Sequence, residues 1–449
     1  MEKFDDIIIG SGPAAFMFSQ GMQGSQRKIA MIDQGNFGGV CPNVGCEPKI
    51  FLEGAVATVL TSRRLQGKGL ATPATLDWPT LMARKKVLFG AYPDKAIKNY
   101  QASGITTIQG TAKFIDQHTV AVDGRRLQAE HIVIATGQVP NKLPITGSDL
   151  TISSNEVFNL DQLPQRVTFI GGGFVSMELA VILNAAGAQV DVIEYAERPL
   201  TAFNAPDVQI VVKEMTQQGI RFHFNQQVDQ VQRTGAQYQV TTKQGLTVTT
   251  DLVVDASGRV PNVAQLNLEQ VGVQVDRGGI LVDQHLQTTV AGIYAAGDVV
   301  SKAPQVAPKL TSTAQFEGEY LSQYLQKTTT AAIQYPVIAT AAFTYPQVAQ
   351  AGMSIATARQ DPAYQVVEYP HLAGDDFFYA GTADENAQLT LVFDQTQQLV
   401  GISEVSQSAA DDVDNFVHLI GLKLRRADFD QRYLPIFPAS AYKLRGMIQ

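Results

Sequence analysis

The chain has 449 residues, which is too many for one ordinary hydrophobic core, so we expect about two to four domains. A hydrophobic content of 45% with 17% charged residues is typical of a globular protein and excludes a disordered chain. The formal net charge of −8, without a clustered Lys/Arg stripe, argues against nucleic acid or an anionic membrane surface as the main partner.

The N-terminal residues MEKFDDIIIGSG lack a basic segment followed by a long apolar run, so we expect no secretory signal. No uninterrupted stretch of about 18 apolar residues occurs, so we expect no transmembrane helix. Two cysteines are too few for a disulfide scaffold in a chain of this length. These features predict a soluble cytoplasmic protein.

The chain opens with a strand, a glycine-rich turn, a helix and a second strand. Residues 5–9 (DDIII) form a short β-rich run that leads into GSGPAA at 10–15. A helical pattern covers 15–23, and the second strand, 27–33, ends on Asp33. This order is the dinucleotide-binding fingerprint, in which Asp33 is placed to accept ribose hydroxyls.

Three small residues of this turn, Gly10, Gly12 and Ala15, fit the pattern G-x-G-x-x-[GA]. The first permits the tight turn, the second lets the backbone approach a pyrophosphate, and the third lets the helix pack on the strand. The N-terminus of the helix then supplies N–H groups and a positive dipole end to the phosphates. The sequence therefore predicts a dinucleotide site here.

The same order of elements returns between residues 165 and 194. Gly171, Gly173 and Ser176 occupy the three small positions, and Ser176 departs from the strict pattern. The second strand ends on Glu194, which favours a free ribose 2′-hydroxyl and repels a 2′-phosphate, so we expect NADH. Arg198, four residues further on, keeps NADPH open as the alternative.

The segments IVIATGQVPN and LVVDASGRVPN are also alike, and each closes one nucleotide-binding domain. Beyond them we expect strands ending in a Gly-Asp turn at 281–300, a helix at 310–326 and a linker at 327–332. Strands at 339–345 and 388–394 and a helix at 411–426 then predict a separate α+β domain.

The expected fold is therefore α/β, with two Rossmann-like nucleotide-binding domains and a C-terminal α+β domain. We place the boundaries at 1–145 for the first part of the first nucleotide-binding domain, 146–262 for the second nucleotide-binding domain, 263–330 for the rest of the first, and 331–449 for the last domain.

Both cysteines of the chain, Cys41 and Cys46, lie in the segment GGVCPNVGCEPK at 38–49. A metal site needs about four ligands, and the six histidines are scattered without paired spacing, so we expect no metal. A structural disulfide is not expected in a cytoplasmic protein. We therefore interpret the two thiols as a redox pair.

The spacing supports this interpretation. In a continuous helix, residues five positions apart have Cα atoms about 8–9 Å apart. A disulfide needs them within about 7 Å, so forming the bond must distort the helix. Pro42, Gly45 and Pro48 make that distortion easier, and a strained disulfide is readily reduced.

This segment, together with the two fingerprints, resembles the class I pyridine nucleotide-disulfide oxidoreductases, the family of glutathione reductase, lipoamide dehydrogenase and mercuric reductase. The likeness covers the whole chain and includes ATGQVP, SGRVPN, GIYAAGDVV and FTYPQVAQAGMS. It implies that the first nucleotide-binding domain holds FAD and the second the nicotinamide cofactor. The last domain is then a homodimer interface that contributes to the partner's active site.

The resemblance also assigns roles in catalysis. Cys46 is implied to be the thiolate in contact with the flavin, and Cys41 the interchange thiol that attacks the substrate. Lys49 is implied to lie near flavin N5, paired with Glu178. A cation there stabilises negative charge that develops on the reduced flavin and on the thiolate.

For the cofactors, the resemblance implies that Asp298 holds the ribityl chain, with Thr311 nearby. Phe174 takes the place of the aromatic gate over the nicotinamide pocket. The remaining cofactor-binding positions that we expect are Gly39, Ala112, Thr136, Gly137, Val175, Gly258 and Arg259.

The chain departs from the family at its C-terminal end. Disulfide-reducing members carry His-Pro-Thr-x-x-Glu, in which the histidine exchanges protons with the interchange thiol and the glutamate orients it. Here the segment is IFPASAYK, so Phe437 replaces the histidine and Tyr442 the glutamate, while Pro438 is kept. Acid–base assistance of this kind contributes roughly 10²- to 10⁴-fold in rate.

These features predict a dimeric NAD(P)H oxidoreductase with FAD and a redox-active Cys41–Cys46 pair that acts on an unusual disulfide or another small-molecule acceptor. Three alternatives stay open. One is flavin-level reduction of a quinone, a metal ion or oxygen. Another is thioether cleavage, as in the oxopropyl coenzyme M reductase branch, which also has Phe at the histidine position but His where this chain has Tyr442. The third is a redox sensor with little turnover.

Overall fold

The computed structural model describes residues 1–302, 307–375, 377–428, 434, 436–439 and 442–443. The chain forms two compact units, each built from three segments. The first unit comprises Met1–Ile50, Ala83–Asn141 and Gly258–Tyr335, and the second comprises Phe51–Met82, Lys142–Ser257 and Pro336–Gln449. The three domains expected from the sequence, the first of them in two parts, divide the chain differently, and their boundaries stay predictions.

The first unit is organised around a five-stranded parallel sheet in the order β21-β8-β2-β3-β4. Successive residues of its central strand pack on opposite faces, Ile7 and Ile9 with one apolar cluster and Ile8 with another. Both faces are buried, which explains the continuous apolar run in the sequence. The strands are Ile293–Ala295, His131–Ile134, Asp6–Ile9, Ile29–Asp33 and Thr106–Gln109.

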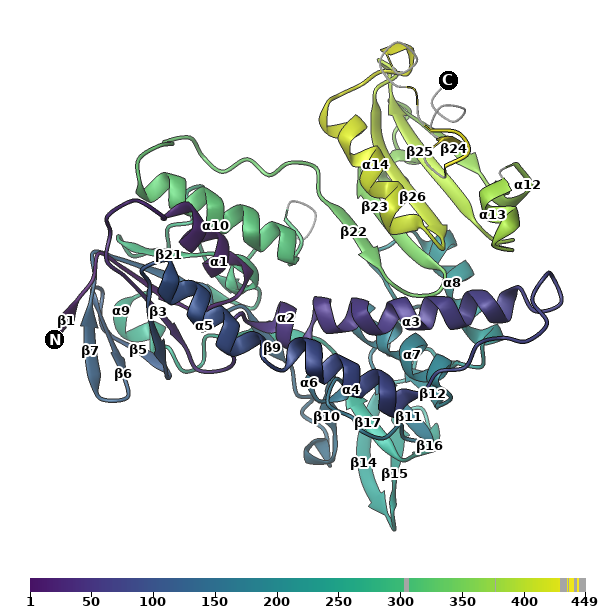
Figure 1. Ribbon diagram of the computed structural model, residues 1–449, viewed down its shortest axis with the longest axis horizontal. Helices are drawn as coiled ribbons and strands as arrows, with labels where there is room; N and C mark the ends of the chain where they lie inside the picture. The colour runs from purple at the N-terminus through teal and green to yellow at the C-terminus, as the bar shows by residue number, and fades with distance from the viewer. Residues whose placement is uncertain (303–306, 376, 429–433, 435, 440–441, 444–449) are drawn as a thin grey trace. The chain divides into compact units, whose positions relative to one another are not determined.

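Helix α1 (Pro13–Gly21) follows the central strand and lies beside α10 (Thr311–Leu325), as Figure 1 shows. Gly318 of α10 permits this close packing, because a Cβ there would lie 2.0 Å from the carbonyl oxygen of Ala14. The other helices of the unit are α2 (Val40–Val44), α5 (Tyr92–Ala102) and α9 (Leu268–Val271).

Smaller sheets complete the first unit. The four-stranded sheet has the order β1-β7-β6-β5, and β9 and β18 form an antiparallel pair, as do β19 and β20. The strands of the four-stranded sheet are β1 (Glu2–Lys3), β7 (Arg125–Gln128), β6 (Thr119–Val122) and β5 (Ala112–Asp116). The paired strands are β9 (Gln138–Pro140), β18 (Arg259–Pro261), β19 (Val275–Asp276) and β20 (Gly279–Ile280). The long helices α3 (Cys46–Arg64) and α4 (Trp78–Phe89) pass from one unit to the other along the chain.

The second unit holds another five-stranded parallel sheet, ordered β10-β17-β11-β12-β13. Helix α7 (Phe174–Ala186) connects two of its strands and is almost fully buried after its first turn. The strands of this sheet are Ile152–Ser153, Leu252–Asp255, Arg166–Ile170, Gln189–Ile193 and Arg221–His223. The unit also contains α6 (Ser154–Val157) and α8 (Ala205–Gln217). A separate antiparallel meander consists of β14 (Val228–Thr234), β15 (Gln237–Thr242) and β16 (Thr247–Thr250). The two parallel sheets confirm the expected α/β class.

The C-terminal part of the second unit is an antiparallel sheet, β22-β23-β26-β25-β24, that packs against α14 (Ala409–Gly421) (Figure 1). Val413, Phe416 and Ile420 form the buried stripe of this helix at helical spacing. The strands are Ala339–Ala342, Gln347–Gly352, Leu399–Ser406, Gln388–Asp394 and Tyr364–Tyr369, and the short helices are α11 (Ile355–Ala358), α12 (Leu372–Asp375) and α13 (Phe377–Gly381).

The helix expected at 411–426 is wrong in its last turn. The structure ends α14 at Gly421, and Lys423 then adopts a left-handed backbone with φ of 54°. The amide of Leu424 closes this turn on the carbonyl of Leu419, and Arg425 forms a bridge with Gln398.

None of the described helices is long and apolar enough to cross a membrane.

Candidate active site

The two cysteines lie on separate helical segments. Cys41 is in α2, and Cys46 is the first residue of α3, because the helix is interrupted at Gly45 (φ −138°, ψ −122°). Both thiols are free in this structure. The distortion expected for a disulfide is therefore already built into the reduced chain, as a break between two helices.

Gly45 fits this break because the backbone folds closely upon itself there. A Cβ on Gly45 would lie 2.9 Å from the carbonyl oxygen of Val40 and 3.3 Å from the Cα of Cys41. The amide of Lys49 donates to the carbonyl of Gly45 at 3.1 Å, which starts α3 immediately after the break. A side chain at position 45 would push the two cysteine segments apart.

The charge of the dithiol is concentrated on Cys46. Its Sγ lies 3.4 Å from the Oγ1 of Thr311, at the N-terminus of α10. The hydrogen bond from Cys41 lowers the pKa of Cys46 to about 6, and Thr311 and the charge of Lys49 act in the same direction. The same hydrogen bond, together with burial, raises the pKa of Cys41. Cys46 is thus the thiolate and Cys41 the thiol that donates to it.

Tyr92 belongs to this site, and the sequence analysis missed it. It begins α5, and its ring lies against Gly38, where a Cβ would approach the Cε1 of Tyr92 to 2.6 Å. Burial and the negative charge of Glu47 raise the pKa of Tyr92, so its hydroxyl keeps its proton. No motif or spacing in the sequence connects Tyr92 to the cysteines.

The first glycine motif has the shape that a dinucleotide requires. Gly10 has φ of 108°, and a Cβ there would lie 2.2 Å from the carbonyl oxygen of Ala135. Gly39 has φ of 72°, and its Cβ would lie 2.6 Å from the Cα of Gly12. A Cβ added to Gly12 would have one neighbour within 4 Å, the Cα of Gly39 at 3.9 Å, which is an ordinary contact distance. A pyrophosphate can therefore approach the backbone at the N-terminus of α1.

Asp33 ends its strand as expected and is held by its neighbours. Its carboxylate accepts hydrogen bonds from the Ser11 hydroxyl at 2.5 Å and the Gly35 amide at 2.8 Å. Ser11 in turn accepts from the amide of Gly38, which connects the glycine motif to the cysteine segment. Ala15, the third small residue, is fully buried in α1.

Other expected FAD-binding residues lie in the same unit. Asp298 follows Gly297, whose amide donates to the buried Glu317 at 2.6 Å, and burial raises the pKa of Asp298. The hydroxyl of the expected Thr136, and that of Thr313, which the sequence analysis did not name, are buried without a partner among the described residues. Buried hydroxyls normally have partners, so these two fit a site that a bound cofactor completes.

Three of the remaining expected positions of the first unit, Gly137, Gly258 and Arg259, form hydrogen bonds with backbone groups of the same unit. Gly137 has φ of 65°, and its carbonyl accepts from the amide of Asn262. Gly258 accepts from the amide of Asn141, and Arg259 donates to the carbonyl of Gln138 at 2.7 Å. The last expected position, Ala112, is buried in the core.

The second glycine motif is open in the same way as the first. Gly171 has φ of 103°, and a Cβ there would lie 2.7 Å from the carbonyl oxygen of Ala256. An added Cβ on Gly173 would meet nothing within 4 Å. Ser176 fits the third position because its hydroxyl donates to the carbonyl of Gly171 at 2.6 Å. Phe174 is 48% exposed at the start of α7, and Val175 is half-buried.

Glu194 and Arg198 are both held by backbone groups. The buried Glu194 accepts from the amides of Gly172 and, at 2.7 Å, Ala196. The guanidinium of Arg198 donates to four carbonyls of its own loop, those of Pro199, Leu200, Thr201 and Phe203. Arg198 is therefore committed to the loop in this structure.

Glu178 is buried in α7, where its Oε1 accepts from the amide of Phe343 at 2.8 Å. Lys49, its expected partner, is half-buried at the start of α3 in the other unit. Their pairing therefore stays a prediction.

Phe437 and Tyr442 form an edge-to-face ring pair, with centroids 4.9 Å apart and an interplanar angle of 74°. Phe437 is 67% exposed, whereas Tyr442 is half-buried. An aromatic pair thus occupies the two positions at which disulfide-reducing relatives are expected to carry their imidazole and carboxylate.

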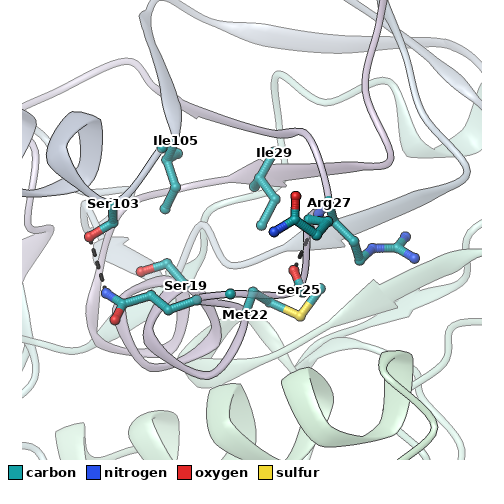
Figure 2. A pocket seen from close by; sticks show the side chains of 11 residues that line it. Ser19, Met22, Ser25, Arg27, Ile29, Ser103 and Ile105 are labelled. Carbon is teal, nitrogen blue, oxygen red and sulfur yellow. Dashed lines mark hydrogen bonds between the residues drawn. The ribbon is translucent and has the colours of Figure 1, made fainter.

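A small cavity of about 180 Å³ lies elsewhere in the first unit. Figure 2 shows its lining, which includes Met22, Arg27 and Ile105. It sits at the C-terminal end of α1, away from the glycine motif at the N-terminal end. Nucleotides bind outside the carboxyl ends of parallel strands, so this cavity is not the dinucleotide site.

Comparison with known proteins identifies the family. The pyridine nucleotide-disulphide oxidoreductase profile matches residues 4–318. The chain belongs to this family. Glutathione reductase of Burkholderia cepacia is 31% identical over 438 residues, which is 95% of this chain and 94% of that protein. Mercuric reductase of Bacillus cereus is 32% identical over 324 residues, and the chain spans 50% of its length.

Family membership confirms the oxidoreductase class expected from the cysteine segment, and FAD with a nicotinamide dinucleotide as its cofactors. Dihydrolipoyl dehydrogenase of Chlamydia pneumoniae is a further relative, 28% identical over 91% of this chain and 88% of that protein. The fold is also that of the HOCl-induced flavoprotein disulfide reductase RclA from Escherichia coli, with a TM-score of 0.88, 24% identity and 99% of each chain covered.

Proposed function

We propose that this chain is an FAD-dependent, NADH-preferring reductase that passes electrons through Cys41 and Cys46 to an unusual disulfide or another small acceptor. The observation that carries this proposal is the difference in pKa between the two thiols, which lie on either side of a helix break. The lower pKa of Cys46 favours a thiolate there, and the raised pKa of Cys41 keeps it a thiol. When bound, the flavin supplies the two-electron exchange between the nicotinamide and this dithiol.

The dithiol can act on a disulfide without an imidazole. Cys46 accepts the Cys41 proton along their hydrogen bond, and the Cys41 thiolate attacks one acceptor sulfur and expels the other as a thiolate. That thiolate takes the proton from Cys46, whose sulfur then attacks Cys41 and releases the second thiolate. The acceptor gains two electrons, and the Cys41–Cys46 disulfide is formed. Tyr92 donates a hydrogen bond to the departing sulfur.

The acceptor pocket is apolar on one side. In the homodimer that we propose, Phe437 and Tyr442 of one chain face the cysteines of the partner. A phenyl ring offers no proton, so reduction of oxidised glutathione is slow and apolar disulfides are favoured. The homodimer is supported by exposed apolar side chains on the C-terminal part of the second unit: Phe377 (88% exposed), Leu422 (70%), Leu434 (76%) and Ile436 (79%).

NADH preference is supported by the loop after Glu194. The carboxylate repels a 2′-phosphate, and Arg198 is engaged with four backbone carbonyls instead of projecting toward one. Glu194→Ala is expected to lower the ratio of kcat/KM for NADH to that for NADPH by about tenfold or more, since it removes the carboxylate that repels the 2′-phosphate. An unchanged ratio would contradict the assignment.

A second candidate function is flavin-level transfer to a quinone, a metal ion or oxygen. The observation that favours it is the aromatic pair at Phe437 and Tyr442, since electron transfer without sulfur exchange needs no proton partner there.

Anaerobic titration with NADH separates the two functions. For the dithiol route we expect two electrons to produce a long-wavelength thiolate-to-flavin absorption band, and Cys41→Ser to abolish turnover of a disulfide probe such as dithiobis(nitrobenzoate). Turnover that survives Cys41→Ser supports flavin-level transfer instead. A bound flavin with no turnover of disulfide, quinone or Cu(II) contradicts both and leaves a sensor.

The missing proton partner is tested by restoring it. Phe437→His with Tyr442→Glu should raise the reduction of oxidised glutathione by about 10²-fold, the lower end of acid–base catalysis. Phe437→His with Tyr442→Phe is the matched control, because it supplies the imidazole without the carboxylate that orients it. No gain in the first variant contradicts our account of this position.

A further inference from the structure

A buried ionic cluster, formed by Lys443, Glu404, Asp412 and Tyr379, lies in the second unit and has no part in the chemistry above. The side chain of Lys443 is only 2% exposed. Its Nζ donates to Asp412 Oδ2 at 2.6 Å and to Glu404 Oε1 at 3.0 Å, and it contacts the hydroxyl of Tyr379.

Three elements contribute to the cluster. Glu404 comes from β26, Asp412 from the first turn of α14 and Tyr379 from α13, and all three are at most 2% exposed. The hydroxyls of Ser406 and Ser408 donate to Glu404 and Asp412, each at 2.6 Å. The strand, the two helices and the C-terminal end of the described chain therefore meet at one ammonium group.

Burial and neighbouring charge act against each other at Lys443, Glu404 and Asp412. Burial lowers the pKa of Lys443, but Glu404 and Asp412 outweigh it, so the pKa is raised and the ammonium is kept. Burial raises the pKa of Glu404 to about 8, although the charge of Lys443 acts in the opposite direction. Burial also acts against the carboxylate of Asp412, but Lys443 and the hydrogen bonds lower its pKa. The ammonium of Lys443 is thus held by two carboxyl groups, and a buried ionic cluster of this kind is costly to break from one side.

The cluster is adjacent in sequence to the aromatic pair. Lys443 directly follows Tyr442, whose ring packs on Phe437. Phe437 and its described neighbours Leu434 and Ile436 are largely exposed, so they do not fix the pair by burial. Among the described residues of this segment, Lys443 is the one side chain buried in the core.

We propose that Lys443 is a positioning residue that fixes Tyr442, and through it Phe437, as the wall of the acceptor pocket. The inference rests on the proposed function, in which this wall faces the partner's cysteines. The hydrogen bonds of Lys443 lie within the cluster of Tyr379, Glu404 and Asp412. We therefore expect its effect in the acceptor half of the reaction, and in the acceptor KM in particular.

The test compares Lys443→Met with Lys423→Met, a matched control at an exposed lysine of the same sheet domain. In the holoenzyme we expect Lys443→Met to raise the KM for dithiobis(nitrobenzoate) by about tenfold, as misplaced binding groups do. The rate of flavin reduction by NADH and the long-wavelength band should stay within about twofold of the parent. Asp412→Asn, which keeps the lysine but removes its anion, should shift KM in the same direction if Lys443→Met does not fold.

A double-mutant cycle shows whether Lys443 acts through Tyr442. In a Tyr442→Ala background, Lys443→Met should give no further change in KM, because the group that it positions is gone. Additive effects on KM, or an equal loss of NADH-driven flavin reduction, would overturn the proposal. If the proposed function itself is wrong, the band or the Cys41 dependence is missing in the parent enzyme, so the two failures are distinguishable.

Discussion

At the residue scale, the reactivity of the dithiol depends on which sulfur carries the charge. Cys46 has a pKa of about 6 and Cys41 a raised one, because the two share a hydrogen bond and Thr311 and Lys49 add to the stabilisation of Cys46. A thiolate forms above its pKa and is lost below it. The asymmetry thus favours a thiolate at Cys46 at neutral pH, the sulfur that we propose contacts the flavin.

The first prediction concerns the pH dependence of this thiolate. In enzyme reduced by NADH, the long-wavelength band should be full at pH 8 and fall to half near pH 6, as Cys46 is protonated. Thr311→Val should move the midpoint upward by about one pH unit, since a hydrogen bond to a charged group contributes about 1.5 kcal/mol or more. Ser312→Ala, at the exposed neighbouring position, is the control. A parent midpoint near 9 contradicts the assignment.

The second prediction concerns Tyr92. Tyr92→Phe removes the hydroxyl that we propose donates to the departing sulfur. It should slow disulfide turnover by about 10- to 100-fold, which corresponds to one charge-assisted hydrogen bond. Reduction of the flavin by NADH should be unaffected. Stopped-flow measurement of the two half-reactions separates these effects, with Tyr195→Phe, an exposed tyrosine, as control. Equal turnover in Tyr92→Phe excludes this role.

At the scale of elements, the break between α2 and α3 sets the geometry of the cysteines. The sequence predicts distortion from Pro42, Gly45 and Pro48, and the structure locates it at Gly45 alone. The reason is steric, because only a residue without Cβ lets the backbone pass this close to Val40 and Cys41.

The third prediction follows from this close approach. Gly45→Ala should lower the free energy of unfolding by about 1–3 kcal/mol, the usual cost of forcing extra atoms into a packed site. It should also slow re-formation of the Cys41–Cys46 disulfide. Gly54→Ala is a sharp control, because Gly54 lies within α3 and an added Cβ meets nothing within 4 Å. It should be neutral or stabilising by up to about 1 kcal/mol. Thermal unfolding and thiol titration report both effects.

At the scale of the whole molecule, the proposed pocket requires two chains. The homodimer that we propose would bury exposed apolar residues of the C-terminal sheet domain, such as Phe377 and Leu422, and removing such surface from water favours association. In such a dimer each chain supplies the dithiol of one site and the aromatic wall of the other.

The fourth prediction is therefore that dimer formation and acceptor turnover are lost together. Phe377→Asp with Leu422→Asp should shift the protein toward monomers in sedimentation analysis and reduce disulfide turnover at least tenfold, because a buried charge is costly. Flavin reduction by NADH should persist in the monomer. Val87→Asp, at an exposed apolar residue of α4, is the control. Full turnover by a monomer contradicts the shared site.

What the sequence by itself determined is local and periodic. The two βαβ units, the small residues Gly10 and Gly171 at their turns, and the acids that close their second strands all follow from patterns within about 30 residues. These patterns depend on backbone conformation and strand periodicity, which neighbouring residues fix. The paired cysteines and the replacement of histidine by Phe437 are likewise properties of short segments.

Only the tertiary structure decided which distant residues act together. Thr311 contacts Cys46, Tyr92 lies beside Gly38, and Lys443 donates to Glu404. No motif or periodic pattern in the sequence predicts these contacts. Arg198 is a further example of what the sequence could not determine. An arginine at this position is able to bind a phosphate, but in the structure its guanidinium donates to the backbone carbonyls of Leu200 and Thr201. Charge and proton affinity depend on partners in space, and chain folding supplies those partners.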